Sequence, residues 1–558
     1  MARSSRLHRP WEMALSFLSP AGESISLSVE YFRYQGALNA QYTLQVLIQS
    51  QALDLTLPAL QTTVKLTVQD PQMQDSFAFW GMLVRSQWLQ APYPKAQSWV
   101  LEIKPLTYLQ TCNVASRAFY GAQVTDVIQT LIHQHAPVHA HIALDARDQT
   151  AYPIHPALIQ FEEPDFKLLD RECRRHGVWY TYWHQDPHVE MRFGDHNHAL
   201  SANLKAPVPI VEHLTSGSSG LYQIRFQFLI KTAGSIRGYY YDEKTGETLE
   251  HVVFIPTSAG TGQTDFLSPD TQISPKQFTH QLQRLALAEA VAQTHVEGYF
   301  TGLWLQPGEI ITLNAPEWAL EGEFLVSTVD YQCVADAARQ EGLQGRERHR
   351  FTALRLQGNY HPRALRLKDA DEPLFSGTMV GVQAYAPEGV HTVTPDEIGR
   401  IPIRYPFAYQ YFFNQTQARY TRVMTESNHA IAGISYPVYR DSELALHFDR
   451  GALNRPQIKG AIANHHTLHQ NAHQAARSIT RLPQGQSLVY SNHLNDQNFL
   501  MLNTQHQENT HQTVMLMNNM PSFTYPGEKH LDFLQMTSSH HTHRMTDSLH
   551  VQVGEVEQ

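Results

Sequence analysis

The sequence predicts a mainly β protein with a few helices, organised in three or four domains. Most of the chain alternates apolar and polar residues with a period of two, which is typical of strands that bury one face. The chain has 558 residues, enough for several domains at roughly 150 residues each. Apolar residues make up 42% and charged residues only 17%, so we expect a globular protein with a polar but weakly charged surface.

The N-terminal region is expected to be mainly antiparallel, with three helices. Its clearest alternating runs are Tyr42, Leu44, Val46 and Ile48, then Val64, Leu66 and Val68, then Trp99, Leu101 and Ile103. An apolar stripe at helical spacing predicts the first helix over 124–132. The second is predicted with Pro164 at its first position and Gly177 as its left-handed stop. Ser274 is the predicted N-cap of the third, which runs from Pro275 to about His295.

A compact β barrel is predicted after a linker. The glycine-rich stretch 215–220 and the polar segment 258–263 are predicted loops, and 368–373 is a predicted inter-domain linker. Four alternating segments follow, and their number and length suit a small five-stranded barrel. These segments are 379–384, 400–405, 419–424 and 444–448.

The composition changes again from about residue 461, where Asn, Gln, His and Thr dominate. Short alternating runs at 487–490, 499–502 and 514–517 provide little apolar area for a self-sufficient core. We therefore expect neighbouring chains to stabilise this part.

The C-terminal residues form a separate candidate strand. Leu549, Val551 and Val553 share one face ahead of Gly554, which predicts a strand that needs partners. A frayed terminus is the alternative interpretation.

Charge and cysteine content exclude several classes of function. Subtracting 52 acidic from 42 basic residues gives −10, and no run of Lys or Arg offers a stripe for phosphates, so no nucleic-acid partner is expected. Cys112, Cys173 and Cys333 fit neither a disulfide framework nor a thiolate zinc site, which indicates a reducing cytosol. Glu12 interrupts the N-terminal apolar stretch, and no stretch reaches the ~18 to 20 apolar residues that span a bilayer.

No motif with adequate spacing predicts catalysis. The sequence lacks His-Glu-x-x-His, Gly-x-Ser-x-Gly and the glycine-rich phosphate-binding patterns. The adjacent carboxylates Glu162 and Glu163 precede the second helix, where acidic groups favour the helix dipole. We interpret them as capping residues rather than as a general acid and base, and we predict no cofactor.

Residues 160–195 carry a specific series: a Gln and an acidic pair, Asp-Phe-x-x-Leu, an Arg-rich helix end, a Gly, aromatic pairs and a closing Asp. The members of the series are Gln160, Glu162, Asp165, Phe166, Leu169, Arg171, Gly177, Tyr180, Tyr182 and Asp195. This series resembles the most recognisable stretch of the VgrG spike proteins of type VI secretion systems. Segments 116–128 and 296–313 resemble the Ser-Arg-x-Phe segment and the Leu-x-Pro-Gly turn of the same family.

The predicted barrel carries two further matches. They consist of Asp396, Glu397, Gly399, Arg400, Ile401 and Ile403, and of Phe448, Gly451, Asn454, Arg455, Pro456, Gly460 and Asn464. These resemble the family's Asp-Glu-x-Gly-Arg strand and its Gly-x-x-x-Arg-Pro-x-x-x-Gly turn. Together the matches cover roughly residues 25 to 470.

The resemblance implies phage tail hub-like β-barrel domains, an oligosaccharide/oligonucleotide-binding (OB) fold barrel and a trimeric β-helical needle. The expected domains are a base with helices over 1–370, the OB barrel over 374–465 and a polar β-rich segment over 466–558. The expected structural residues are Asp165, Arg171 and Gly177 at the second helix, Gly399, Arg400, Arg455, Pro456 and Gly460 in the barrel, and Val551, Val553 and Gly554 at the start of the needle.

Three departures from the family pattern stand out. The glycine expected near Arg440 is missing, and Tyr405-Pro406-Phe407 is not followed by Trp-Asp, so the barrel loops are expected to differ. The chain also ends almost where the needle's valine-glycine repeats begin in the family. The needle is therefore expected to be short, truncated, or completed by another chain.

The function implied is that of a non-enzymatic structural part of a contractile injection machine. A homotrimeric puncturing spike would sit on an Hcp-like tube protein and carry effectors or a PAAR-type tip protein. It would be made in the bacterial cytoplasm, assembled on the secretion apparatus and translocated out, and it would meet a membrane only by mechanical puncture. The alternatives are a phage or prophage tail hub and a tail-associated cell-wall hydrolase.

Two groups of side chains leave alternatives open. His541 and His543 share a face if they lie in a strand, so three copies could supply six imidazoles to a metal, while a solvated polar segment is the alternative. His133/His135 and His139/His141 have the same spacing but are predicted at a helix end and in a loop. The barrel's aromatic cluster is interpreted as core or inter-chain packing, with ligand stacking as the alternative. Its members are Tyr405, Phe407, Tyr409, Tyr411, Phe412 and Phe413.

Overall fold

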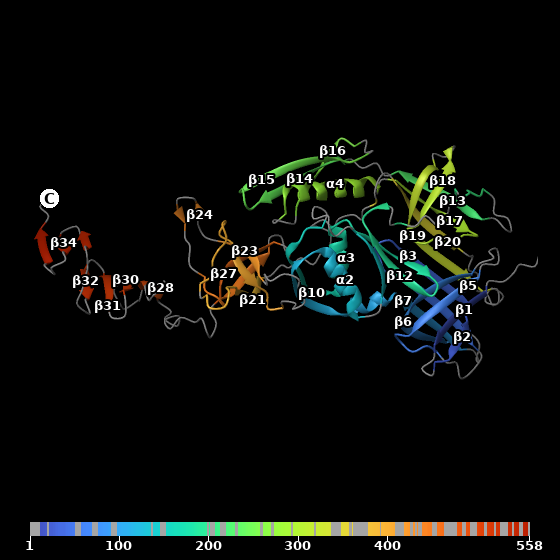
Figure 1. Ribbon diagram of the computed structural model, residues 1–558, viewed down its shortest axis with the longest axis horizontal. Coiled ribbons are helices and arrows are strands. Elements are labelled where there is room, and N and C mark those ends of the chain that lie inside the picture. Colours follow the sequence, from blue (N-terminus) through green and yellow to red (C-terminus); the bar gives the residue numbers. More distant parts are fainter. Residues whose placement is uncertain are drawn as a thin grey trace, which may run out of the picture. The chain divides into compact units, whose positions relative to one another are not determined.

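A computed structural model shows a chain of two compact units, Met1–Ile462 and Ala463–Gln558 (Figure 1). The residues that the structure describes are 12–18, 22–50, 57–69, 76–90, 97–135, 138–144, 152–197, 200, 207–212, 219–228, 233–256, 260–268, 273–291, 294–316, 320–335, 348–356, 360, 378–390, 392–407, 418–424, 428–429, 432–433, 438–448, 453, 455–462, 477–481, 487–491, 499–506, 510–517, 520–524, 534–537, 541–545 and 551–555. The predicted linker 368–373 lies outside these residues.

The first unit is built on a 12-stranded sheet. In spatial order its strands are β13 (Gly220–Phe228), β17 (Thr294–Thr301), β20 (Arg348–Arg355), β19 (Leu320–Val334), β3 (Tyr31–Ala37), β4 (Thr43–Ser50), β7 (Gln97–Lys104), β6 (Ser76–Gln90), β5 (Thr63–Gln69), β1 (Glu12–Leu18) and β2 (Ser24–Ser28), with β18 (Ile310–Ala315) pairing β19 off this path. All neighbours pair antiparallel, as the sequence predicts.

The alternating runs bury the residues that the pattern predicts. Leu44, Val46, Leu66 and Leu101 are each fully buried in the main core of the unit. Their polar neighbours lie on the opposite face because successive strand residues alternate sides.

Three smaller sheets and the helices complete the base. The sheets pair β10 (His155–Pro164) with β8 (Val114–Ala122), β12 (His188–Gly194) with β11 (Trp179–Gln185) and β9 (His139–Ala143), and β14 (Ala233–Asp242) with β15 (Glu247–Phe254) and β16 (Gly262–Leu267). The helices are η1 (Leu106–Tyr108), α1 (Leu109–Cys112), α2 (Val124–His135), α3 (Asp165–Arg175) and α4 (Pro275–Val291). Helix α4 packs Phe278, Leu282 and Leu285 against the β14 sheet.

The helices differ from the predictions at their ends. Pro164 is the last residue of β10 and the N-cap of α3, so the helix starts one residue later than predicted. The serine cap of α4 is confirmed, because the amide of Gln277 donates to Ser274 Oγ at 3.3 Å. However, α4 ends at Val291 rather than near His295, because His295 lies in β17 and pairs there with Leu354.

Two predicted loops also contain strand ends. Gly220 starts β13 and Gly262 starts β16, while 213–218 and 257–259 lie outside the described residues. His139 and His141, predicted in a loop, lie in β9, which pairs parallel with β12. In each case the competing signal is a non-local strand pairing, which the local turn composition does not reveal.

The predicted five-stranded barrel is confirmed. It closes in the order β21 (Thr378–Ala384), β22 (Ile401–Arg404), β23 (Arg419–Val423), β27 (Pro456–Ala461) and β26 (Glu443–Phe448). A two-stranded hairpin pairs β24 (Asn428–His429) with β25 (Ala432–Gly433). Where the family pattern leads us to expect a glycine, Asp441 adopts the left-handed conformation with φ 63°. Aspartate tolerates that conformation better than most residues, so the turn forms without glycine.

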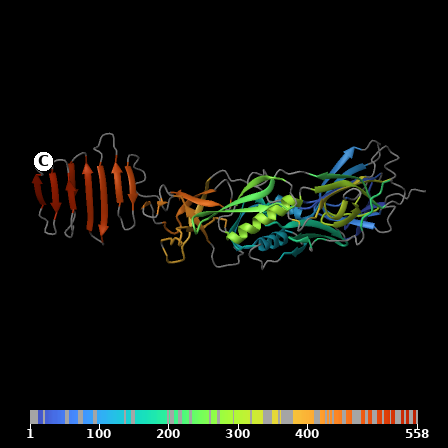
Figure 2. The same ribbon diagram turned by 90° about the horizontal axis from the view of Figure 1, so that it is seen from above.

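The strands that the structure describes in the second unit form two antiparallel meanders, each a single layer (Figure 2). The five-stranded meander runs in the order β28 (Arg477–Arg481), β29 (Ser487–Ser491), β30 (Phe499–His506), β31 (Thr510–Met517) and β32 (Met520–Thr524). The three-stranded meander is β33 (Leu534–Thr537), β34 (His541–Met545) and β35 (Val551–Glu555). The predicted strands at 487–490, 499–502 and 514–517 are therefore present.

No helix among the described residues combines the length and the apolar character that crossing a membrane requires.

Candidate functional site

The segment that carries the clearest motif folds around a buried arginine. Arg171 lies on α3, and its guanidinium is almost fully buried. It donates to the carboxylate of Glu163 at 2.6 Å, to the carbonyl of Ile159 at 2.8 Å and to the carboxylate of Glu172. One cation therefore joins helix α3 to strand β10.

Glu163 does not act as the predicted capping residue. It is buried in β10 and pairs with Arg171, and the cap of α3 has no side-chain hydrogen bond. A register shift between Gln160 and Glu163 and a left-handed Glu162, with φ 46°, place consecutive carboxylates in different surroundings. Such a bulge bends the strand just before the helix begins.

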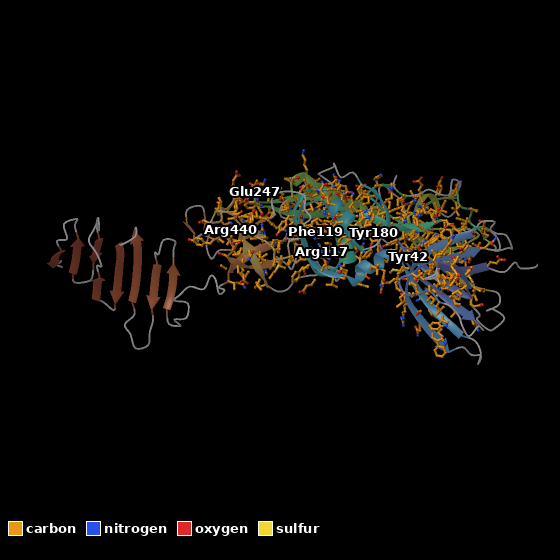
Figure 3. All side chains as sticks on the ribbon, turned by 60° about the horizontal axis from the view of Figure 1, so that its bottom comes forward. Tyr42, Arg117, Phe119, Tyr180, Glu247 and Arg440 are labelled. Carbon is orange, nitrogen blue, oxygen red and sulfur yellow. The ribbon has the colours of Figure 1, made fainter. Side chains whose placement is uncertain are left out.

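Asp165 is the second centre of this network and is completely buried. Its carboxylate accepts hydrogen bonds from Asn113 at 2.6 Å and from Gln160 at 2.8 Å, and it lies 3.1 Å from the guanidinium of Arg117 on β8 (labelled in Figure 3). The predicted residues Asp165 and Arg171 thus link the three elements β8, β10 and α3.

Glu172 takes part from the same helix. Burial alone raises its pKa, but the charges of Arg175 and Arg171 outweigh burial and hold the pKa below its usual value. The carboxylate therefore stays ionised within the cluster. Gly177 ends the helix with φ 67°, as predicted.

The barrel shares its apolar core with the antiparallel pair of strands β8 and β10 in the base. Ala118, Tyr120 and Ile159 belong to the same buried cluster as Ile403 and Leu446 of the barrel. The barrel amide of Tyr405 donates to the Tyr120 hydroxyl at 2.8 Å. The barrel is therefore fixed to the base by packing as well as by hydrogen bonds.

Three barrel arginines reach the subdomain formed by β14, β15, β16 and α4. Arg400 lies 3.3 Å from the carboxylate of Glu243 while its Nε donates to Asp396 at 2.7 Å. Arg455 donates to the carbonyl of the fully buried Ser268. The guanidinium of Arg422 lies 5.2 Å from the ring centroid of Tyr241. We call Arg400, Arg422 and Arg455 the arginine junction.

The remaining barrel residues have separate roles. Gly399 closes a turn with φ 78°, where its amide donates to the carbonyl of Asp396. Pro456 starts β27 opposite Phe448, a position where a strand tolerates proline. Gly460 lies beside a register shift, but a Cβ atom there would meet nothing within 4 Å. Close packing therefore does not require a glycine at 460.

The aromatic cluster is confirmed as packing for its two described members. Tyr405 is buried and stacks on Phe407, whose ring also lies 5.9 Å from that of Phe161 in the base. The other members lie outside the described residues, as do Gly451, Asn454 and Asn464 of the second barrel match.

The histidine and valine predictions fall in the last meander. His541 lies opposite Glu555, His543 opposite Val553, and Thr542 opposite Gly554. Val551 and Val553 lie in β35 with Gly554, while Leu549 is outside the described residues. The two histidines and the two valines thus share one face of this sheet. The metal site at His541 and His543 stays a prediction.

The family profile of the phage tail baseplate hub (GPD) matches residues 36–337, which is more than half of the chain. The chain belongs to the phage tail baseplate hub family. No curated protein matches the sequence of this hub protein.

Solved structures share the fold of the hub protein. The E. coli c3393 protein, a component of the type VI secretion system, is 12% identical with a TM-score of 0.51, covering 78% of this chain and 97% of that one. A chain of the lidless PdpA-VgrG complex is 9% identical with a TM-score of 0.61, covering 93% and 98%. The half-lidded Francisella PdpA-VgrG complex gives 0.62 at 9% identity, covering 93% and 88%. The resemblance to VgrG spike proteins is thus confirmed for the fold.

The hub protein also has a buried turn that the sequence did not single out as a site. At this Leu-x-Pro-Gly turn, the side chain of Gln306 accepts from the amide of His184 at 2.7 Å and donates to its carbonyl at 3.3 Å. The amide of Gln306 donates to the carboxylate of Glu309 at 3.1 Å. Burial raises the pKa of Glu309 to about 7. No ionic motif in the sequence marks this carboxylate.

The imidazole of His184 forms a hydrogen bond with the backbone of strand β6 in the base. The amide of Trp80 donates to its Nδ1 at 3.2 Å, so Nε2 carries the proton and donates to the Tyr34 hydroxyl at 3.1 Å. The Tyr42 hydroxyl (labelled in Figure 3) donates to the carbonyl of the same Trp80. Burial lowers the pKa of His184 to about 3, so the ring stays neutral.

Replacing Glu309 with glutamine is expected to stabilise the hub protein at pH 8 and to have little effect at pH 5. The folded-state pKa of about 7 lies above the usual value of 4.5. Between these two pH values the folded state binds more protons than the unfolded state, so the free energy of unfolding falls as the pH rises through this range. The full difference corresponds to roughly 3 kcal/mol. Glutamine keeps the acceptor for Gln306 without the charge. The unfolding temperature of the variant and of the unchanged protein, measured at pH 5 and at pH 8, tests this prediction. Glu247→Gln is the control, because Glu247 is exposed. An equal change in unfolding temperature at both pH values would exclude titration of Glu309 as the cause.

Proposed function

We propose that the chain is one of three identical subunits of a puncturing spike in a contractile injection machine. The base, residues 1–370, sits on an Hcp-like tube protein, and the OB barrel over 374–465 and the segment over 466–558 lead outward. A PAAR-type tip protein or an effector binds at the C-terminal end. The spike is made in the bacterial cytoplasm, assembled on the secretion apparatus and translocated out of the cell.

The observation that carries the proposal is the single-layer architecture of the second unit. An antiparallel sheet is stable in water when at least one face packs on another layer. The described strands of this unit form two meanders, and neither is covered by a second layer of the same unit (Figure 2). Two further copies of the chain would provide the missing layers.

The link between base and barrel supports a mechanical role. A spike must pass force from its base to its leading end without bending between them. The shared apolar core around Tyr120 and Ile403 and the arginine junction both hold the barrel to the base. A shared core and buried hydrogen bonds between base and barrel suit a protein that transmits a compressive force.

The mass in solution tests the proposal. The full chain of 63.5 kDa is expected at about 190 kDa by light scattering at micromolar concentration, three times the chain mass. A chain stopped after Ile462 is expected to lose most of this association. A full-length monomer at that concentration would contradict the trimer.

The proposal assigns no catalysis to the spike. Among the described residues, no group of three or more His, Cys, Asp or Glu side chains converges as metal ligands would. Zymography on peptidoglycan tests the hydrolase alternative, and a cleared zone that is lost in Glu508→Gln or Glu528→Gln would favour it. Neighbouring genes distinguish a secretion system from a prophage.

A further inference from the structure

Strand β15 lies at the edge of its three-stranded sheet. The order of this sheet is β15-β14-β16, so among the described strands β15 pairs with β14 alone. Its register with β14 runs from Ser235 opposite Phe254 to Asp242 opposite Glu247 without a shift. Helix α4 packs against one face of the sheet (Figure 1). We call the side of β15 that no other described strand pairs with the open edge.

The hydrogen bond that follows β15 shows which of its residues turn to the open edge. The amide of Ile255 donates to the carbonyl of Gly234 at 2.9 Å, so the backbone of Ile255 turns toward the β14 side. The backbone groups of successive residues in an antiparallel strand alternate between its two sides. Every second residue counted back from Ile255 therefore also bonds β14, and the residues between them turn their N–H and C=O groups to the open edge. These residues are Thr248, Glu250, Val252 and Phe254.

The side chains of β15 are apolar on both faces. Leu249 and Val253 pack against the core under α4, whereas on the other face Val252 is 40% and Phe254 79% exposed. Apolar residues on both faces are typical of an inner strand. Edge strands are usually protected from pairing by lysine, proline or a bulge, and β15 contains none of these. The strand thus has the side chains of an inner strand at the edge of its sheet.

The formal charges of β15 are both negative. They belong to Glu247 (labelled in Figure 3) and Glu250, and both residues are exposed. The Nε atom of Arg237 lies 3.9 Å from the carboxylate of Glu250 but only 3.0 Å from that of Asp265. One arginine therefore stands beside two carboxylates. A basic residue opposite Glu250 on a neighbouring strand would complement this charge.

We infer that β15 accepts an extended, basic segment of another protein as a fourth strand. N–H and C=O groups at the edge of a sheet pair with an extended chain, whereas a helix already bonds its own backbone groups internally. The added strand has apolar residues beside Val252 and Phe254 and a basic residue beside Glu250. A second copy that paired through the same edge would need a twofold axis, which the proposed trimer lacks; on this point the inference rests on the proposed function.

The probe for the open edge is the labelled peptide Val-Thr-Val-Thr-Lys-Thr-Lys. In an antiparallel register its valines lie opposite Phe254 and Val252, and its first lysine lies opposite Glu250. It is compared with a peptide that has glutamate in place of both lysines, by fluorescence anisotropy with the full chain. At least tenfold tighter binding of the lysine peptide is expected. Equal binding of the two peptides, or binding of neither, would overturn the inference.

Matched variants at one position test whether the backbone does the binding. Val252→Pro removes an N–H group from the open edge, and proline is tolerated at an edge where the N–H bonds no neighbouring strand. It is expected to weaken binding of the lysine peptide at least tenfold and to leave hydrogen exchange in Ala233–Asp242 unchanged. Val252→Thr keeps the N–H group and the branched shape, so binding is expected to stay within twofold. Unchanged binding in Val252→Pro would exclude an added strand.

Charge reversal keeps the inference testable if the proline disturbs the sheet. Glu250→Lys leaves the backbone as it is, and it is expected to weaken binding of the lysine peptide and to strengthen binding of the glutamate peptide. Equal affinities of this variant and the unchanged chain for both peptides would exclude the open edge as the binding site.

The mass in solution separates this inference from the proposed function. Val252→Pro is expected to keep the mass of the unchanged protein. A lower mass would show that another copy of the chain occupies the open edge, which would overturn the inference. A trimer that binds neither peptide contradicts only this inference, whereas a monomeric full chain contradicts the proposed function.

Discussion

Replacing Arg171 with methionine is expected to lower the free energy of unfolding of the first unit by about 3 to 5 kcal/mol. The change leaves the buried carboxylates of Glu163 and Glu172 without the cation that pairs with both. It also removes the donor to the carbonyl of Ile159. Urea unfolding of the full chain, followed by tryptophan fluorescence, measures the loss.

The matched control for this prediction is Lys167→Met on the same helix. Lys167 is exposed, so the same change of charge there is expected to alter stability by no more than about 0.5 kcal/mol. Adding Glu163→Met to Arg171→Met is expected to restore part of the loss, because one uncompensated buried charge disappears. A loss below about 1 kcal/mol for Arg171→Met would show that the carboxylates find other partners.

The sequence predicted those features that depend on interactions between residues close together in the chain. Alternation identified the buried faces of the long strands, and the stop at Gly177 and the serine cap of α4 follow from backbone conformation and hydrogen bonding within a few residues. The five-stranded barrel was predicted from the number and length of the alternating segments. The predicted extension of α4 to His295 failed because pairing with a distant strand overrode helix propensity.

Partners far apart in the sequence were not predictable in this way. Alternation shows that a residue is buried, but not what it meets. Arg455 was expected to shape its own barrel, yet it bonds Ser268, which is 187 residues away. Likewise, no motif indicated that the imidazole of His184 would satisfy the backbone of Trp80 or that Glu309 would be buried.

Replacing Arg455 with alanine is expected to loosen the barrel and the β14–β16 subdomain together. The guanidinium is buried, and its bond to the carbonyl of Ser268 joins strand β27 to the end of strand β16. Hydrogen bonds to charged groups contribute about 1.5 to 3 kcal/mol, so a loss of about that size is expected. Hydrogen exchange should rise in both Pro456–Ala461 and Gly262–Leu267.

The matched control is Arg440→Ala, because Arg440 (labelled in Figure 3) donates to the carbonyl of Pro387 within the barrel's own loops and is more exposed. It is expected to leave exchange in Gly262–Leu267 unchanged. If Arg455→Ala raised exchange in the barrel strand alone, the residue would act only within the barrel, as its motif suggested. Faster exchange in both segments would mean that Arg455 stabilises the barrel and the β14–β16 subdomain together. A hydrogen bond that joins two parts of a fold stabilises both of them, so its loss should increase local opening in both.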